Sequence, residues 1–381
     1  MKCLFRMLIS VLGCSFLGTS LVFSSEKDAV VKVDKKVLRI GFFPNLTHSQ
    51  ALVAQAMTHQ GNGWLERYLP KDVKIEWRRF NAGPSAMENL IAGVVDISYV
   101  GPSPALNLYN RTKGKDCRLL VGAAKGGAGL VLQRDFEVKN ENSWKNKRIA
   151  TPQYGNTQDI ACRAWFKNRN IKDVAFLPTS NPDQLALFKR HQIDGVWTIE
   201  PWLSRLVNEA GGKVYLSDDD NWTTILVGSA KFCEDFGALK TVLIQAHKDL
   251  SLWIKGHVEE AAKLIQSELK NQTALDFSLN MIRNTLQRIH IATEVEPATL
   301  QKWVDDACAV GFLKRENVVP LTGFMQEVPK ETITKVPGKA ESPAVVSEKS
   351  EKSVEDVAKP AENIIGKVEL TVGKDAKAYN R

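Results

Sequence analysis

The sequence predicts an α/β protein with two similar lobes, each built around a mostly parallel sheet. Strand-like and helix-like patterns alternate between about 37 and 327, as they do in α/β folds. The stretch GPSAMENLIAGVVD (83–96) matches NPDQLALFKRHQID (181–194), because both have Pro in second place and Asp twelve residues after it. Upstream, LRIGFFPNLTHSQALVAQAM (38–57) matches KRIATPQYGNTQDIACRAWF (147–166). Two matches in the same order indicate a duplicated domain rather than short stacked repeats.

The composition is typical of a globular chain and argues against some partners. The 381 residues are 44% hydrophobic and 25% charged, and the net charge is +8. This length allows two domains. Because no block of Lys and Arg interrupts the chain, the mild basic excess predicts weak steering of anions and no nucleic-acid partner.

The first 25 residues, MKCLFRMLISVLGCSFLGTSLVFSS, predict a signal peptide with a basic start, an apolar run and then small residues. Cleavage near 22–24 is one interpretation. The alternative is a lipoprotein signal that ends before Cys14, because the sequence Val-Leu-Gly-Cys at 11–14 is similar to a bacterial lipobox. Both predict an exported protein, periplasmic or in the cell envelope, and the second adds a lipid anchor.

The first lobe is expected to begin with a strand at 38–43 that leads through a polar loop into a helix. Thr47 and Gln50 have the spacing of a capping box at the start of that helix. Ser85 and Glu88 have the same spacing at the start of the next helix. The polar loops before both helices are therefore expected to be fixed by side-chain caps.

The matching stretch of the second lobe, TPQYGNTQDIACRAWF (151–166), predicts a strand end, a corner at Gly155 and a helix with Asn156 or Thr157 as its N-cap. A second interpretation of this corner is an anion cradle, since a helix N-terminus offers unpaired N–H groups and the positive end of a dipole. The next helix is expected to have Asn181 as its N-cap and Pro in its first position.

The C-terminal part, 328–381, is rich in Lys, Glu, Ser, Pro and Val. Such a composition cannot bury enough apolar surface to offset the entropy of ordering. We expect a charged, disordered tail, with one short strand in IIGKVELTVGKDAKAYNR as the only element.

Four cysteines remain after export, namely Cys117, Cys162, Cys233 and Cys308. None forms a CxxC pair and no His lies at metal-ligand spacing, so no metal site is expected. We expect buried free thiols, with one disulfide as the alternative. P-loop, HExxH and GxSxG patterns are also missing, and GAAKGGAG (122–129) lacks the GxGxxG spacing, so neither a cofactor nor a catalytic site is expected.

Five polar corners with Gly or Pro fall where strands are expected to end and helices to begin. They are 45–48, 83–85, 101–104, 155–158 and 200–202. In open α/β sheets, ligands bind beyond the carboxyl ends of the strands. Two facing lobes would therefore direct all five corners at one cleft.

Five segments together resemble a known family. They are RIGFFPNLTHSQAL, FNAGPSAMENLIAGVVDISYVGPSPALN, KRIATPQYGNTQDIACRAW, NPDQLALFKRHQIDGVWTIEPWLSRLV and TTILVGS. In this order they resemble the solute-binding proteins of ABC importers, in the aliphatic sulfonate, taurine and nitrate (NMT1-like) branch. The likeness runs from about 38 to 325. It implies a type II periplasmic-binding-protein fold, with two α/β lobes, a hinge and an interlobe ligand cleft. The implied bounds are lobe 1 at 37–126 plus 227–327, lobe 2 at 127–226, and crossings near 124–130 and 224–229.

The resemblance also implies a ligand shell at the polar corners. In the first lobe its residues are Asn45, Thr47, His48, Gly83, Pro84, Ser85, Gly101, Pro102 and Ser103. In the second lobe they are Asn156, Thr157, Gln158, Trp197, Glu200 and Trp202. Backbone amides, hydroxyls and side-chain amides can satisfy the three oxygens of a sulfonate without a paired cation.

Several of these side chains also have structural interpretations. Trp197 and Trp202 are either core residues or an apolar wall of the site. Glu200 either caps a helix or binds an amino group, such as that of taurine. His48 is either a loop residue or a ligand contact.

We expect a binding protein that captures a small organic anion, closes around it, and docks as a monomer on a membrane permease whose ATPase drives uptake. An aliphatic sulfonate or taurine-like ligand is expected first, with nitrate second. Two further hypotheses are a same-fold enzyme or binder for a pyrimidine or thiamine precursor, with Cys162 as its candidate nucleophile, and a ligand-sensing module. Asp96 and Asp194 are expected to end strands or cap turns rather than act in acid–base chemistry.

Overall fold

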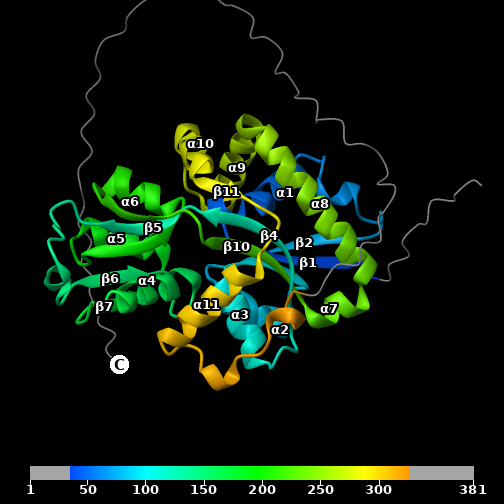
Figure 1. The fold of residues 1–381 in the computed structure, drawn as a ribbon. Helices are drawn as coiled ribbons and strands as arrows, with labels where there is room; N and C mark the ends of the chain where they lie inside the picture. Colours follow the sequence, from blue (N-terminus) through cyan, green and yellow to red (C-terminus); the bar gives the residue numbers. More distant parts are fainter. Residues whose placement is uncertain (1–34, 326–381) are drawn as a thin grey trace, which may run out of the picture. The chain divides into compact units, whose positions relative to one another are not determined.

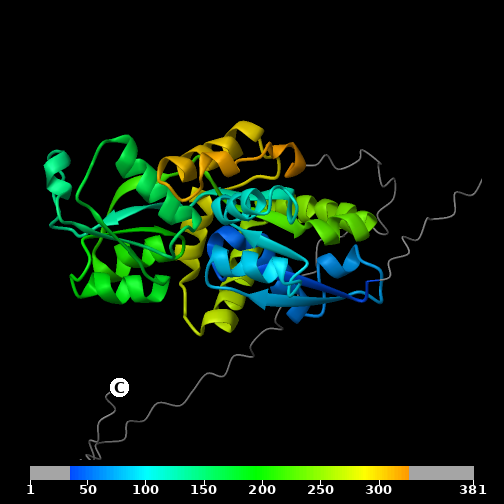
Figure 2. The same cartoon turned by 90° about the horizontal axis from the view of Figure 1, so that it is seen from below.

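The computed structural model describes residues 35–325, which form two α/β lobes (Figures 1 and 2). The chain enters the second lobe at Gly126 and Gly127, whose φ angles of 72° and 69° suit glycine. No helix in the described range is both long and apolar enough to cross a bilayer. The expected signal peptide, the lipid anchor at Cys14 and the C-terminal tail lie outside the described residues.

The first lobe contains a six-stranded sheet. Its strands, in spatial order, are β11 (Ile289–Ile291), β4 (Cys117–Gly126), β10 (Trp222–Ser229), β3 (Ile97–Val100), β1 (Val37–Phe42) and β2 (Lys74–Arg79). The strands β1, β2 and β3 run parallel, whereas β10 is antiparallel to β3 and β4. The central strands are almost entirely buried, which fits a sheet with helices on both faces.

The second lobe repeats this arrangement with five strands. They are β7 (Ala175–Pro178), β6 (Arg148–Thr151), β8 (Gly195–Ile199), β5 (Ala128–Leu132) and β9 (Lys213–Asp218). Here β6, β7 and β8 are parallel, and β5 is antiparallel to β8 and β9. The order β7-β6-β8-β5-β9 matches β2-β1-β3-β10-β4 strand for strand, so the predicted duplication is confirmed.

Helices cover the sheets of both lobes (Figure 1). Those of the first lobe are α1 (Ser49–His59), α2 (Gly83–Ile91), α3 (Pro102–Arg111), α7 (Ala230–Asp235), α8 (Gly237–Gly256), α9 (Val258–Thr273), α10 (Leu279–Arg288) and α11 (Pro297–Ala309). Those of the second lobe are α4 (Thr157–Asn168), α5 (Asn181–Lys189) and α6 (Trp202–Ala210). The helix α11 packs against both α3 and α4, and it therefore connects the lobes outside the crossing strands.

The duplication extends to individual hydrogen bonds. The carboxylate of Asp96 accepts from the backbone N–H of Arg39 at 2.8 Å and from its Nε at 3.2 Å. Asp194 accepts from the N–H and Nε of Arg148 at the same two distances. Asp96 lies just before β3 and ties it to β1, and Asp194 lies just before β8 and ties it to the parallel strand β6, which agrees with the structural role expected of both.

The second crossing between the lobes lies earlier than the resemblance implied. The strand β10 begins at Trp222 and pairs with β3 and β4 of the first sheet. The chain therefore returns between Asp218 and Trp222 rather than near 224–229. The segment 222–226 belongs with the first lobe because its backbone hydrogen bonds are made there.

Both predicted capping boxes are wrong. The chain first forms a short 3-10 helix at Leu46–His48, so α1 begins at Ser49, and Gln50 instead donates to the carbonyl of Ala123 at 3.0 Å. The helix α2 begins before Ser85, whose hydroxyl donates back to the carbonyl of Ala82 at 2.9 Å. Ser85 therefore lies within the first turn of α2 and is not its N-cap.

The caps of the second lobe are closer to prediction. Of the two predicted N-caps of α4, Asn156 and Thr157, the structure has Asn156, whose side chain accepts from the N–H of Asp159 at 2.8 Å. The N-cap of α5 is Ser180, so Asn181 is the first residue of that helix rather than its cap.

The cysteines of the described range are free thiols, in line with the expectation. Cys117, Cys162 and Cys233 are buried, and Cys308 is partly buried. Burial raises the pKa of the Cys162 thiol well above its ordinary value. Cys162 is therefore protonated and packed in the apolar core of the second lobe, which does not suit a nucleophile.

Candidate ligand-binding site

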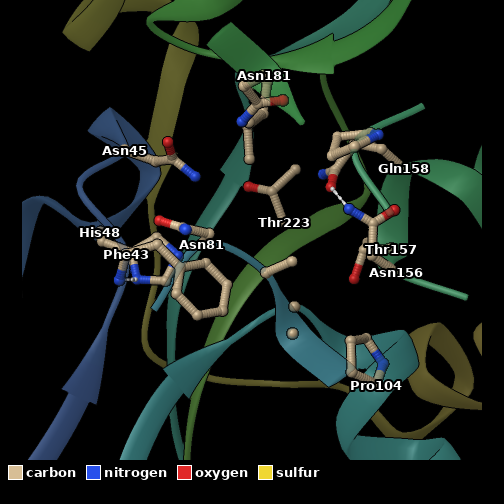
Figure 3. A pocket seen from close by; sticks show the side chains of 15 residues that line it. Phe43, Asn45, His48, Asn81, Pro104, Asn156, Thr157, Gln158, Asn181 and Thr223 are labelled. Atoms are coloured by element: carbon tan, nitrogen blue, oxygen red, sulfur yellow. Dashed lines mark hydrogen bonds between the residues drawn. The ribbon is translucent and has the colours of Figure 1, made fainter. Parts of the chain in front are cut away.

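A narrow cavity lies where the ends of the strands of both lobes face each other (Figure 3). Its volume is about 20 Å³. It is lined by Phe43, Asn45, His48, Asn81, Ala82, Gly83, Gly101, Pro104, Pro152, Asn156, Thr157, Gln158, Asn181, Ile199 and Thr223. These lining residues include no acidic side chain, no Lys and no Arg. The cavity is therefore polar but has no formal charge of its own while its histidine is neutral.

The two lobes meet closely beside this cavity. A Cβ atom built on Gly101 of the first lobe would lie 2.0 Å from the Oγ1 of Thr157 in the second. That distance is far shorter than a van der Waals contact, so only glycine permits the approach. We call this arrangement, in which the lobes touch beside the cavity, the closed form of the cleft.

The start of α4 directs hydrogen-bond donors at the cavity. The Oδ1 of Asn156 caps the N–H of Asp159, while the N–H groups of Thr157 and Gln158 precede Ile160, whose N–H is the first to bond back to the carbonyl of Asn156. The Nδ2 of Asn156 donates to the Oε1 of Gln158 at 3.3 Å, which occupies that oxygen (Figure 3). The side-chain nitrogen of Gln158 is left to donate to a ligand.

The corner before α4 is built on the carboxylate of Asp159, which is fully buried. It accepts from the hydroxyl of Thr151 at 2.7 Å, from the N–H of Gly155 at 2.9 Å and from the guanidinium of Arg163 at 2.9 Å. The charge of this carboxylate is thus neutralised by partners that do not line the cavity. Gly155 itself has a φ of 75°, and a Cβ there would lie 2.0 Å from the ring of Phe312.

His48 contributes a neutral imidazole to the opposite wall. Its side chain is buried, and its Nδ1 accepts from the backbone N–H of Phe43 at 3.3 Å. Burial lowers the pKa of His48 to about 3. The ring is therefore uncharged near neutral pH and carries its hydrogen on Nε2, which makes that atom a donor.

Asn181 also directs a donor at the cavity, and Thr223 fixes the backbone beside it. The hydroxyl of Thr198 donates to the Oδ1 of Asn181 at 3.4 Å, so the Nδ2 of Asn181 is the group left for a ligand. The hydroxyl of Thr223 donates to the carbonyl of Gly126 at 2.9 Å and ties the lining to the lobe crossing. The lining side chains whose orientation is fixed by hydrogen bonds, those of His48, Gln158 and Asn181, thus present donors to the cavity, which suits a ligand rich in acceptors.

The structure brings seven of the fifteen expected ligand residues to the cavity. They are Asn45, His48, Gly83, Gly101, Asn156, Thr157 and Gln158. Five others lie in the same corners without lining it, namely Thr47, Pro84, Ser85, Pro102 and Ser103. The hydroxyls of Thr47, Ser103 and Thr157 are buried and have no hydrogen-bond partner within residues 35–325. Buried hydroxyls without partners are unusual, and three of them gather around this cleft.

The remaining three expected residues lie away from the cavity. Trp197 packs in the apolar core of the second lobe, and Trp202 lies beneath the guanidinium of Arg205 at 5.0 Å. The carboxylate of Glu200 accepts from the backbone N–H of Ser204 at 3.1 Å and from its hydroxyl at 3.0 Å. Glu200 thus caps α6, which is the structural interpretation of this residue.

The sequence reasoning missed eight lining residues. They are Phe43, Asn81, Ala82, Pro104, Pro152, Asn181, Ile199 and Thr223. Pro104 lies inside the expected corner 101–104 without having been named as a ligand contact, and Phe43, Asn81, Ala82 and Ile199 lie within two residues of an expected corner. Thr223 has no such signal, because it reaches the cavity only through the return of the chain into β10.

Comparisons with known proteins fit this arrangement. A Bacillus subtilis (strain 168) protein named for aliphatic sulfonate binding is 25% identical over 269 residues, which are 68% of this chain and 76% of that protein. The taurine-binding periplasmic protein of Escherichia coli (strain K12) is 28% identical over 148 residues, 38% of this chain and 44% of its own length.

A solved structure is also similar, namely the alkanesulfonate-binding protein SsuA from Xanthomonas axonopodis pv. citri bound to MOPS. The TM-score is 0.62 at 19% identity, over 77% of this chain and 99% of that one. This likeness shows the periplasmic-binding-protein fold. The sequence model of the NMT1-like family matches residues 32–267. The chain therefore belongs to the NMT1-like family.

Proposed function

We propose that this chain is the solute-binding component of an ABC importer and that it captures a small organic anion between its lobes. The ligands we favour are an aliphatic sulfonate and the related zwitterion taurine, with nitrate as a smaller alternative. The observation that carries this proposal is the uncharged, donor-rich lining of the cleft. The relatives named for sulfonate and taurine binding support the same ligand class.

A sulfonate matches the lining in both charge and hydrogen bonding. It stays ionised at ordinary pH, and its three oxygens only accept hydrogen bonds. The Nε2 of His48, the side-chain nitrogen of Gln158 and the amides that begin α4 are all donors. An anion at a partly buried helix N-terminus gains up to about 2 kcal/mol. Several such contacts are compatible with micromolar binding, about −8 kcal/mol.

The size of the cavity requires the lobes to open for the ligand to enter. A volume of about 20 Å³ accommodates roughly one water molecule. A sulfonate with even one methyl group is larger than this. The lobes therefore part for the ligand to enter and close around it slightly less tightly than in this structure, so a short alkyl chain is easier to enclose than a long one.

The direct test is isothermal calorimetry on the mature chain with methanesulfonate, longer alkanesulfonates, taurine, nitrate and a neutral pyrimidine. We expect binding of sulfonates or taurine. Thr157→Val removes a buried hydroxyl that has no hydrogen-bond partner among residues 35–325, and we expect it to weaken binding about tenfold, since a hydrogen bond to a charged group contributes about 1.5–3 kcal/mol. Thr241→Val is the matched control, because its hydroxyl bonds within α8.

The outcomes separate the candidate functions. Binding of the pyrimidine alone would reject the anion and keep the fold. Equal affinity of the Thr157→Val variant and the wild type would reject the α4 terminus as the anion contact. Delivery to a permease is checked separately, by uptake of the bound ligand into cells with and without this chain.

A further inference from the structure

The carboxylate of Glu200 lies between the two lobes at the hinge side of the cleft. It follows β8 of the second lobe and is fully buried. Its partner is Arg288, the last residue of α10 in the first lobe, whose Nη2 lies 2.5 Å from the Oε1 of Glu200. The side chain of Arg288 is 44% exposed. This ion pair therefore joins the lobes directly.

Glu200 also makes a second contact with the first lobe, next to the candidate site. Its backbone carbonyl accepts from the N–H of Leu46 at 3.1 Å. Leu46 opens the short helical turn that carries His48 into the cavity. One residue of the second lobe thus holds both the end of α10 and a ligand-site turn of the first lobe.

Within its own lobe the carboxylate is bonded only to Ser204 among the described side chains and backbone groups. Both of its oxygens interact with Ser204, and the Oγ of Ser204 also accepts from Arg288 at 2.8 Å. Loss of the guanidinium would leave a buried negative charge with only neutral donors, which is strongly unfavourable. Parting of the lobes must therefore replace the arginine with water.

A larger cavity adjoins this pair and provides room for that water. Its volume is about 230 Å³, and it is lined by residues of both lobes, including Glu200, Ser204, Asn284 and Arg288. The cavity keeps Arg288 partly hydrated. Water can therefore replace the guanidinium at Glu200 step by step as the lobes part. The ion pair thus shifts the equilibrium between the open and closed forms and does not hold the protein in one of them.

We infer that the Glu200–Arg288 pair is an interlobe junction that favours the closed form and positions the Leu46–His48 turn at the ligand cleft. Glu200 is accordingly a positioning residue and not a contact of the ligand. The inference rests on the two-lobed fold, and it rests on the proposed function only where ligand affinity is measured.

The test compares Glu200→Gln, Arg288→Gln and the double variant with the wild type. Arg283→Gln is the matched control, since Arg283 lies on the same helix and pairs with Glu259 inside the first lobe. Two measurements need no ligand: hydrogen exchange of the Leu46 amide and the radius of gyration by X-ray scattering. A third is the Kd for methanesulfonate.

We expect Arg288→Gln to speed hydrogen exchange of the Leu46 amide and to weaken methanesulfonate binding about tenfold. This factor lies in the lower part of the usual range for coupling between sites, because Arg288 is already partly hydrated in the wild type. Its radius of gyration should rise. Glu200→Gln should have a smaller effect, and the double variant should resemble it, because neither leaves a buried charge without a partner. Arg283→Gln should change none of the three.

Exchange and scattering that are unchanged in both single variants would overturn the inference. If Arg288→Gln does not fold, the double variant decides, because its exchange at Leu46 must still exceed that of Arg283→Gln. If methanesulfonate binds to no form of the protein, the proposed ligand fails while exchange and scattering still decide the junction.

Discussion

Lowering the pH from 7 to 4.5 should destabilise this protein through two buried histidines. Besides His48, His247 of α8 is buried, and burial lowers the pKa of its ring to about 4. Its Nδ1 lies 3.0 Å from the hydroxyl of Tyr99 and its Nε2 lies 2.9 Å from the carbonyl of Gly122. The carbonyl can only accept, so Nε2 carries the hydrogen and Nδ1 accepts from Tyr99. Both rings are therefore neutral in the fold, and each would lose an accepted hydrogen bond on protonation.

The sign and size of the effect follow from the shifted pKa values. Both folded pKa values, about 3 for His48 and about 4 for His247, lie below the ordinary 6.5. Between these limits the unfolded chain binds more protons than the folded one, so stability falls as the pH drops below 6.5. At pH 4.5 each ring costs about 2.5 kcal/mol, at 1.36 kcal/mol per pKa unit. Together they remove about 5 kcal/mol, a large part of a typical total of 5–15 kcal/mol.

The assay is urea unfolding at pH 7 and 4.5 for the wild type, His48→Gln, His247→Gln and the double variant. Each single variant should lose about half of the pH-dependent change, and the double variant most of it, by the same linkage. Carboxylates with a lowered pKa, such as Glu209 beside Arg205, lose most of their stabilising effect below their ordinary pKa of 4.5, so the histidines dominate this window. A double variant that loses as much stability as the wild type between the two pH values would refute the reasoning.

Two glycine substitutions test the contacts around the cleft. Gly101→Ala places a methyl group 2.0 Å from the Oγ1 of Thr157, and such overpacking costs about 1–3 kcal/mol. The ligand-free lobes can part to relieve this cost, whereas lobes closed around a ligand cannot. The Kd for methanesulfonate should therefore rise roughly 5- to 150-fold, while the free energy of unfolding of the ligand-free chain falls by much less; an unaltered Kd would show that the lobes do not close on this contact. Gly155→Ala forces a left-handed backbone on alanine and displaces Phe312, so the free energy of unfolding should fall by at least about 1–2 kcal/mol, and a denaturation midpoint equal to that of the wild type would contradict it.

The features that could be predicted from the sequence are local ones or are repeated in both lobes. The matched aspartates Asp96 and Asp194 were recognisable because a spacing from Pro recurs, and the structure shows the same bonds to Arg39 and Arg148. The N-cap of α4 was recognisable because Asn156 acts within three residues of itself. In both cases the interaction that decides the structure lies within a short or a repeated segment.

The features that could not be predicted depend on contacts between distant segments. Gln50 has the spacing of a capping residue, but tertiary structure directs it to the carbonyl of Ala123 and the hydroxyl of Ser251. Thr223 reaches the cavity because β10 inserts between β3 and β4, although the whole second lobe separates it from them along the chain. Glu200 is separated from Arg288 by 88 residues. No pattern of spacing within one segment contains such information.

The duplication also explains where specificity arises. The edges of the two sheets that face away from the cleft keep the same aspartate–arginine bonds, so they are constrained by the fold. At the cleft the corresponding corners differ: the first lobe places a short 3-10 turn with His48 where the second places the capped start of α4. One corner supplies an imidazole N–H and the other supplies backbone amides, and both are donors. Two corners of common origin have thus reached the same hydrogen-bonding character by different chemistry, as expected if the shared constraint is an acceptor-rich ligand between them.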